Sequence, residues 1–257
     1  MITVQRALKA AGKHLSRTGL AVRAALGARK ARYCPACGQS VVGFFRYGHN
    51  GEWGCPACGA SPRERLVNYL VDKGTLTLPR GGAILHMAPN EHSLVTRFRD
   101  AARDYVPADL DPSRYPLPDV QRVDLMAIGE TGRFDLFYAS HVMEHVPDDA
   151  RVFGQIFDCL KPGGEAWLMV PLWQPTDRPT EDGAPDMSPR ERERRFGQWD
   201  HVRQYGLDFA DRIRKAGFAV DLLRASDCPA EDVARMALDD VIFRARKPAD
   251  AAPAPRG

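Results

Sequence analysis

Four polar residues that could do chemistry follow a short apolar run. The run, residues 134–139 (Phe-Asp-Leu-Phe-Tyr-Ala), has the length and composition of a buried strand. Imidazole titrates near neutrality, and with carboxylates it serves general acid–base catalysis. Ligands in open α/β sheets bind at the carboxyl ends of strands, where these four residues are expected. They are Ser140, His141, Glu144 and His145.

Four cysteines in two CxxC pairs form a second chemical group. Cys34 and Cys37 are separated from Cys55 and Cys58 by seventeen residues, a spacing typical of zinc sites. Four thiolates around tetrahedral zinc make a closed structural site. We therefore predict a zinc ribbon at 33–60, with one hairpin built from strands near 41–47 and 52–53. A thioredoxin-like redox role is the alternative, but two matched pairs argue against it.

A strand–helix–strand unit must position the first group. Asp148 is suited to capping a helix, in which apolar residues then recur at spacings of three and four. The breaker Lys161-Pro162-Gly163-Gly164 is expected to end this helix, and an apolar strand at 166–170 follows. Short connections between these elements predict a parallel sheet.

The run FDL…SHVMEHVPDD…CLKPGG resembles the fourth motif and following helix of class I S-adenosylmethionine-dependent methyltransferases. The resemblance extends over residues 82–246. It implies an α/β fold with a doubly wound, mostly parallel seven-stranded Rossmann-like sheet, and it implies S-adenosylmethionine as cofactor. An ordinary α/β crossover with polar loop residues is the alternative. The predicted segments are a basic helix (1–32), the zinc ribbon (33–60), a helical connector (61–80), the methyltransferase domain (81–248) and a disordered tail (249–257).

The resemblance also implies which residues hold the cofactor. The loop after the first strand (83–88) lacks the glycines usual in the family, so either the cofactor sits differently there or its binding has been lost. An acid after the second strand suits two ribose hydroxyls, and Asp109 is preferred to Asp111. Asp124 resembles the residue that takes the adenine amino group, although it could equally cap a turn. The predicted set is His86, Ala88, Pro89, Asp109, Leu110, Asp111, Asp124, Leu125, Ser140 and His141.

A Pro-rich insertion at 172–203 leaves the sheet where a lid could cover the site. Its charged run, 191–195, is interpreted as a solvated helix, and the aromatic and polar run 195–205 as part of the substrate wall. His145 is the preferred base, with His201 and His141 as the other candidates, and each could instead make a structural hydrogen bond. Arg203 and Tyr205 are expected to orient an anionic or sugar-like acceptor.

Charge is unevenly distributed along the 257 residues. Residues 1–32 hold eight Lys or Arg and no acid, whereas the whole chain has a net charge of +3. An amphipathic helix over 1–30 would lie on an anionic membrane surface, dock on a protein partner or nucleic acid, or pack on the protein itself. No apolar run reaches the ~20 residues of a membrane span. The cysteine pattern favours a reducing compartment, and we expect the cytoplasm.

Three functions are compatible with these features. The first is methyl transfer from S-adenosylmethionine to an oxygen or nitrogen of a small-molecule or glycan acceptor. The second is methylation of RNA, held by the basic arm and by the ribbon aromatics Phe44, Phe45, Tyr47 and Trp53. The third is a non-catalytic docking protein with a degenerate methyltransferase domain.

Overall fold

The computed structural model describes residues 2–48, 50–174 and 177–250, with side chains from residue 10 onward. Two compact units emerge. The first combines the chain up to Leu78 with residues 91–97 and 224–241, and the second contains the rest. The tail predicted at 249–257 lies outside the described residues from 251 onward. Within the described part of the chain, we find no helix long and apolar enough to cross a membrane.

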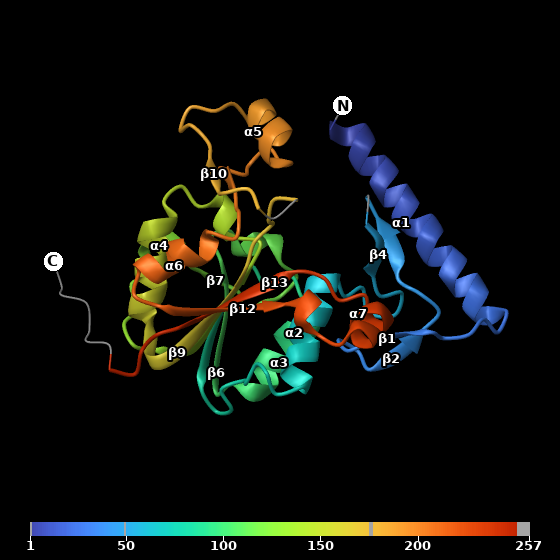
Figure 1. The fold of residues 1–257 in the computed structure, drawn as a ribbon, viewed down its shortest axis with the longest axis horizontal. Coiled ribbons are helices and arrows are strands. Elements are labelled where there is room, and N and C mark those ends of the chain that lie inside the picture. The colour runs from blue at the N-terminus through green and yellow to red at the C-terminus, as the bar shows by residue number, and fades with distance from the viewer. Residues whose placement is uncertain (1, 49, 175–176, 251–257) are drawn as a thin grey trace. The chain divides into compact units, whose positions relative to one another are not determined.

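A seven-stranded sheet forms the centre of the second unit (Figure 1). Its order is β12-β13-β9-β8-β5-β6-β7. β5, β6, β7, β8 and β9 pair in parallel, and β13 runs antiparallel to β9. The predicted mostly parallel seven-stranded fold is confirmed. The strands span Ala83–Met87 (β5), Asp104–Asp109 (β6), Gln121–Arg122 (β7), Phe134–Ser140 (β8), Leu160–Met169 (β9), Ala219–Arg224 (β12) and Val241–Arg246 (β13).

The strand order reverses between β5 and β8. From β5 the chain continues outward through β6 and β7, and then returns to β8 on the other side of β5. Ligands of open α/β sheets bind outside the carboxyl ends of the strands at such a switch point. The reversal therefore marks the edge beyond Met87 and Ser140 as the expected site.

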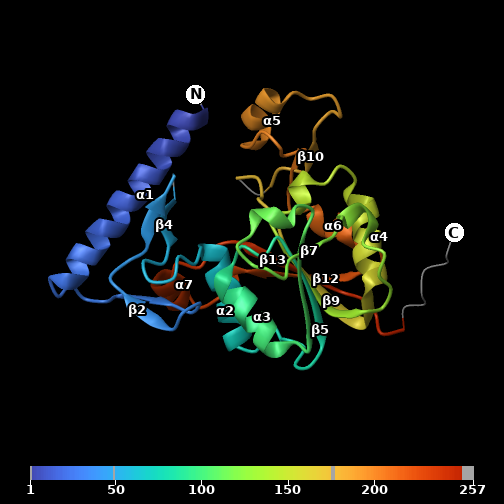
Figure 2. The ribbon, with the colours of Figure 1, turned by 180° about the vertical axis from the view of Figure 1, so that it is seen from behind.

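Helices α4 (Asp149–Cys159) and α6 (Phe209–Lys215) lie side by side in both ribbon views (Figures 1 and 2). The Asp148 side chain caps α4 by accepting from the Arg151 amide, as predicted. α4 ends at Cys159, with Leu160 as its C-cap, directly before the predicted breaker. The following strand begins earlier than the predicted 166–170, because β9 already pairs with β8 at Leu160 and takes up the breaker in a register shift.

The first unit contains two small hairpins rather than the single one predicted. β1 (Arg32–Cys34) pairs with β2 (Gln39–Val41), and β3 (Phe45–Tyr47) pairs with β4 (Asn50–Gly54), all antiparallel. The predicted strand over 41–47 is split because Val41 belongs to the first hairpin and Phe45 to the second. The unit also contains α2 (Pro62–Asp72), the single turn η4 (Ala225–Asp227) and α7 (Ala230–Met236), and α3 (His92–Ala101) begins in it.

Arg65 of α2 joins the parts of the first unit. Its side chain is fully buried, and its guanidinium lies 3.9 Å from the Phe44 ring centroid. A guanidinium has five N–H donors, and here it makes five hydrogen bonds, all to backbone carbonyls. Burial lowers the pKa of Arg65 to about 10, which still leaves it charged at neutral pH. The acceptors are the carbonyls of Glu52, Trp53, Ala60, Met236 and Ala237.

Helix α1 spans Ile2–Ala25, shorter than the predicted 1–30, because Gly27 adopts a left-handed conformation that ends it. It contacts β3 through Ser16, which accepts from the Arg46 amide, and through Lys13 over the Phe45 ring. Leu15 of the predicted apolar stripe is 75% exposed, and Val22 and Leu26 are also exposed. Docking of this stripe on a membrane or partner stays a prediction.

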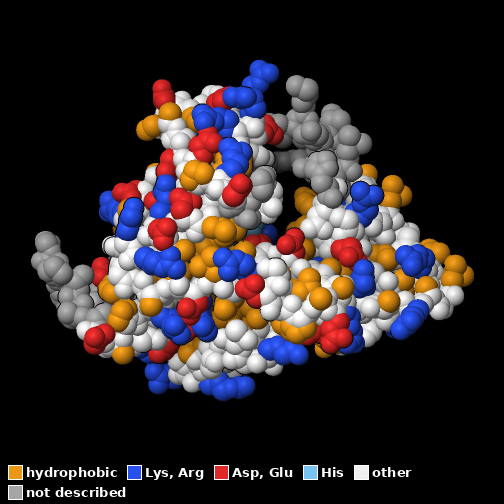
Figure 3. Space-filling view, viewed as in Figure 1, with side chains coloured by type: hydrophobic (Ala, Val, Ile, Leu, Met, Phe, Trp, Pro, Cys, Tyr) orange, Lys and Arg blue, Asp and Glu red, His pale blue; other side chains and the backbone are white. Residues whose placement is uncertain are grey.

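The insertion forms a small substructure in the second unit. β10 (Glu181–Asp182) pairs with β11 (Arg203–Gln204), and α5 (Pro189–Phe196) lies between them in sequence. The charged run 191–195 lies on α5, and Arg194 and Arg195 are exposed, as predicted for a solvated helix. Acidic and basic side chains intermingle around this region in the space-filling view (Figure 3).

Candidate active site

A cavity of about 370 Å³ opens at the switch point. This volume lies in the usual range of small-molecule sites, about 300–1,000 Å³. Loops after β5, β6, β7 and β8 line it, together with the end of the insertion. The lining residues are Met87, Ala88, Asn90, Asp109, Leu110, Arg114, Tyr115, Val123, Asp124, Leu125, Met126, His141, Val142, His145, Val146, Pro147, Gln198 and Asp200.

Ala88 occupies the glycine-free loop after β5. Its φ is +51°, in the left-handed region where glycine is usual, and its amide donates to the Ala108 carbonyl at 2.8 Å. This conformation costs an alanine roughly 1–2 kcal/mol. The loop therefore adopts a glycine-like backbone without a glycine, and the side chain lines the cavity.

Asp109 ends β6 with its carboxylate at the cavity. One oxygen accepts from the Asp111 amide at 2.9 Å and the other from the Tyr115 hydroxyl at 2.6 Å. Burial and this hydrogen bond raise the pKa of Tyr115, so its hydroxyl stays protonated and donates. A carboxylate offers about four lone-pair sites. Asp109 therefore has acceptor capacity left for a ligand in the cavity.

Other predicted cofactor residues divide into two groups. Asp124 and Leu125 line the cavity, and the Asp124 side chain also caps the single turn η2 (Leu125–Ala127) through the Met126 amide. His86, Pro89, Asp111 and Ser140 do not line it. His86 is buried in the core, where Nδ1 lies 2.9 Å from the Tyr105 hydroxyl. Asp111 is exposed and caps the single turn η1 (Pro112–Arg114).

The residues after β8 form a compact polar cluster. His141 takes φ +56°, and η3 (Met143–His145) follows it as a single 3₁₀ turn. Glu144 is only 1% exposed, and one carboxylate oxygen lies 3.6 Å from His141 Nδ1 and 4.0 Å from His201 Nε2. The imidazoles of His141 and His201 thus lie on either side of one carboxylate, that of Glu144.

His145 and His201 meet edge to face, with ring centroids 4.9 Å apart. His145 lines the cavity, and its Nδ1 lies 3.5 Å from the Asp200 carboxylate. His201 is buried behind it, and its Nδ1 donates to the Phe196 carbonyl at 3.0 Å. Burial, with the neighbouring His145, lowers the pKa of His201 to about 4, so this ring is neutral at pH 7.

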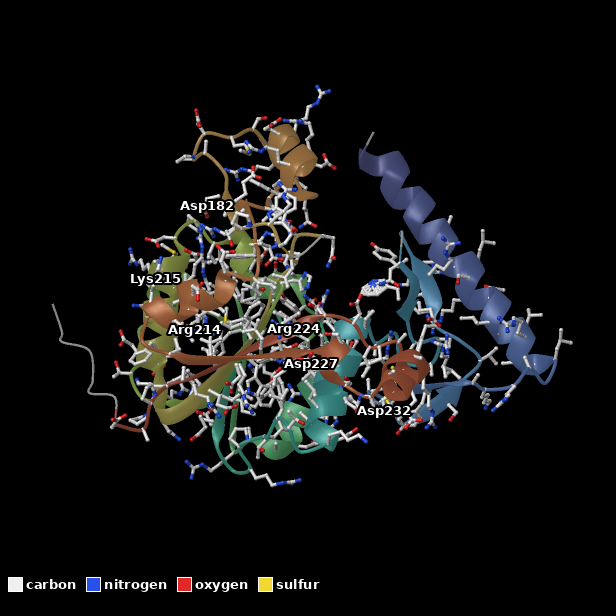
Figure 4. The ribbon with its side chains drawn as sticks, in the orientation of Figure 1. Asp182, Arg214, Lys215, Arg224, Asp227 and Asp232 are labelled. Atoms are coloured by element: carbon white, nitrogen blue, oxygen red, sulfur yellow. The ribbon has the colours of Figure 1, made fainter. Side chains whose placement is uncertain are left out.

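Arg203 and Tyr205 are buried outside the cavity and hold η3 in place. Arg203 donates to the carbonyls of Met143, Val146 and Pro147 and pairs with Asp182 at 2.7 Å. The Tyr205 hydroxyl lies 3.2 Å from the Met143 carbonyl. Asp182, labelled in Figure 4, lies at the base of the insertion. These contacts position the turn, whereas the sequence suggested direct contact with an acceptor.

The four cysteines come together in the first unit. The sulfurs of Cys34 and Cys58 are 3.8 Å apart, and those of Cys37 and Cys55 are 3.9 Å apart. Zinc–sulfur bonds of about 2.3 Å in a tetrahedron place sulfurs about 3.8 Å apart, so the cluster fits zinc. All four sulfurs lie within 4.8 Å of one another.

Several lining residues were not predicted from the sequence. Arg114 and Tyr115 follow the acid-ending second strand by a few residues, and Tyr115 contacts Asp109 directly. Gln198 and Asp200 also line the cavity, and both belong to the run 195–205 that the sequence assigned to the substrate wall. Glu144, one of the four polar residues after β8, is not among the lining residues and lies beside His141 and His201.

Comparison with known protein families identifies the family of the chain. The family model described as "Methyltransferase domain" matches residues 51–222, which is more than half of the chain. The chain therefore belongs to this family, and it is an S-adenosylmethionine-dependent methyltransferase. No curated protein sequence matches the chain.

Solved structures of similar fold include an S-adenosylmethionine-dependent methyltransferase from Mesorhizobium loti. It is 16% identical, with a TM-score of 0.47, and the match covers 68% of this chain and 94% of that one. Another is the 1,6-didemethyltoxoflavin-N1-methyltransferase of Burkholderia thailandensis, solved with 1,6-didemethyltoxoflavin and S-adenosylhomocysteine. It is 18% identical, with a TM-score of 0.47, and the match covers 71% of this chain and 76% of that one.

Proposed function

We propose that the protein transfers a methyl group to an oxygen or nitrogen of a small-molecule or sugar-like acceptor bound in the switch-point cavity. The observation that carries this proposal is the cavity itself, which joins the Asp109 carboxylate to the imidazoles of His141 and His145. The Asp109 carboxylate can accept hydrogen bonds from hydroxyl groups of a ligand, and the two imidazoles can take up a proton.

The lining residues fit S-adenosylmethionine. Asp109 has the lone pairs to accept from two ribose hydroxyls, and Leu125 offers an apolar surface for a base. The left-handed φ of Ala88 gives the loop the backbone path that a glycine would give, with one small methyl group added at the cavity. When bound, the cofactor supplies a methyl group on a sulfonium, whose carbon–sulfur bond breaks with the electron pair staying on sulfur.

The chain's own contribution is to align the acceptor and to take up its proton. His145 and His141 lie at the cavity wall, within reach of a nucleophile bound there. Alignment of a nucleophile is a large part of catalysis when the electrophile is already reactive. The carbonyl contacts from Arg203 and Tyr205 fix the turn that carries His145.

The burial of two aromatic side chains of the ribbon favours a small methyl acceptor over RNA. Phe44 and Phe45 are buried, which removes two of the four rings that could stack on bases. The four-cysteine cluster serves as a structural zinc site in this proposal. A zinc–thiolate site and free thiols suit a reducing compartment such as the cytoplasm.

The first experiment is calorimetric titration of the zinc-loaded protein with S-adenosylmethionine and S-adenosylhomocysteine. We expect micromolar binding in the wild type. Asp109→Asn, which keeps the shape but loses the charge, should weaken binding at least tenfold. Asp111→Asn is the matched control, because its side chain lies outside the cavity, and it should bind as the wild type does.

Each outcome bears on the proposal. Equal affinity in Asp109→Asn and wild type would remove Asp109 from the cofactor site. Absence of binding to the folded wild type would overturn the proposal and favour the non-catalytic docking protein.

A further inference from the structure

We propose that Glu144, His145 and His201 bind a divalent transition-metal ion at the wall of the cavity. One ligand atom from each residue lies within 4.8 Å of the others. Two of the residues share the turn η3 after β8, and the third comes from the end of the insertion. Two imidazoles and one carboxylate form the donor set of catalytic zinc and non-haem iron sites.

The orientation of both rings supports this assignment. His201 donates its Nδ1 proton to the Phe196 carbonyl, which leaves Nε2 as a lone pair facing Glu144 at 4.0 Å. His145 directs Nδ1 toward the carbonyl and carboxylate oxygens of Asp200, at 3.4 and 3.5 Å, which leaves its Nε2 available. Metal-bound histidines usually donate their second N–H to such an oxygen.

The spacing requires only a small adjustment. Ligands of one tetrahedral ion with bonds of about 2.0–2.1 Å lie about 3.3 Å apart, so binding draws the three atoms together by up to about 1.5 Å. The backbone of the turn is already fixed, because Val202 donates to the Glu144 carbonyl at 2.9 Å and Arg203 donates to its neighbours. Side-chain rotation therefore supplies the adjustment.

The ion's role rests on the proposed function, whereas its binding does not. Glu144 and His201 are buried, and His145 faces the cavity, so the open coordination positions face the cavity as well. A site with three protein ligands and an open position is the arrangement of catalytic metals. An acceptor hydroxyl would bind there with its pKa lowered by the divalent cation. Because both nitrogens of a metal-bound His145 are engaged, His141 at the cavity wall would take up the proton. This makes a hydroxyl-bearing acceptor the substrate class.

Manganese titration of the full-length protein tests the site. The protein is first chelated mildly until one zinc per chain remains, which the four-cysteine cluster retains. Free Mn²⁺ is then followed by its electron paramagnetic resonance signal, with Zn²⁺ as competitor. We expect one further ion per chain. Glu144→Gln and His201→Ala should each weaken binding at least tenfold, while His92→Ala, an exposed imidazole outside the cavity, should leave it unchanged.

Two results would overturn the inference. The first is that folded wild type binds no second ion at 1 mM Mn²⁺ or Zn²⁺, a concentration about a thousandfold above micromolar affinity. The second is that both ligand variants bind the ion as tightly as the wild type does. Thermal melts of each variant show whether it is folded. Titration with S-adenosylmethionine in parallel separates the two proposals. Cofactor binding without a second ion removes the metal site alone. A second ion without cofactor binding removes the proposed function and leaves the metal site intact.

Discussion

The two clusters of metal-ligand residues differ in how much of the coordination sphere the protein fills. In the first unit, four cysteines offer a complete tetrahedron. In the second unit, Glu144, His145 and His201 offer three ligands beside a cavity. Four protein ligands leave nothing for a substrate, whereas three leave an open position. The comparison teaches that ligand number and access distinguish a cluster that holds a fold from one that can act on a ligand.

The largest expected effect is loss of the closed cluster. Cys55→Ser removes one of four thiolates, and structural zinc binding in small modules contributes about 10 kcal/mol or more to folding. We expect the variant to lose its tightly bound zinc and the first unit to unfold, as measured by metal analysis and proteolysis. Cys228→Ser is the control, since this thiol lies outside the cluster. Retention of zinc and of protease resistance in Cys55→Ser would contradict the structural role.

The second largest effect is expected at Arg65, in the unit that holds the four cysteines. Arg65→Met leaves five carbonyls without their donor, and we expect a loss of about 3–5 kcal/mol in the free energy of unfolding. Urea unfolding measures this loss. Arg32→Met, whose ion pair with Glu52 is partly exposed to solvent, should cost far less. Similar losses in the two variants would show that the carbonyl network carries little stability.

Substitutions in the three-ligand cluster beside the cavity should lower turnover rather than stability. His145→Ala is expected to lower kcat about 10²–10³-fold, as loss of a group acting at the reacting centre does. Affinity for S-adenosylmethionine and the melting temperature should change little. His92→Ala serves as the control. An unchanged kcat in His145→Ala would exclude a catalytic role for this residue.

The smallest effect concerns the ion pairs that hold the insertion. Burial alone would raise the pKa of Asp182, but hydrogen bonds from Arg212 and Arg203 outweigh it and lower the pKa. The carboxylate therefore adds stability above its unfolded pKa of about 3.9, and this is lost as pH falls through the lower folded value. Because the side chain is 46% exposed, we expect less than about 1 kcal/mol.

Urea unfolding of wild type and Asp182→Asn at pH 7 and pH 3 tests this sign. The difference between the two proteins should shrink at pH 3. A difference that grows at pH 3 would mean that the folded pKa of Asp182 is raised instead.

Much of the fold could be predicted because its signals are local. The CxxC spacing specifies a four-sulfur cluster within 25 residues, and alternating apolar runs with an Asp cap specify the βαβ unit. Asp109 and His145 could be predicted because Asp109 stands at the end of a strand and His145 lies in the turn that follows one. Both line the cavity in the structure.

The remainder depends on contacts between distant residues. His201 reaches Glu144 only after the insertion folds back, and no pattern in the sequence encodes that return. Ala88 takes a glycine-like conformation because the sheet around it constrains the loop, which propensity alone would not predict. His86 was predicted near the cofactor, but its side chain points into the core, since neighbouring strand residues face opposite sides of the sheet.

The Arg65 network also constrains the order in which the molecule can be completed on the ribosome. Three of its carbonyl partners precede Arg65, but those of Met236 and Ala237 are synthesised after nearly all the strands of the sheet. Because chains emerge from the N-terminus, the first unit waits unfinished while the second is translated. The segment 224–241 is then the last piece of a unit begun at the other end of the chain.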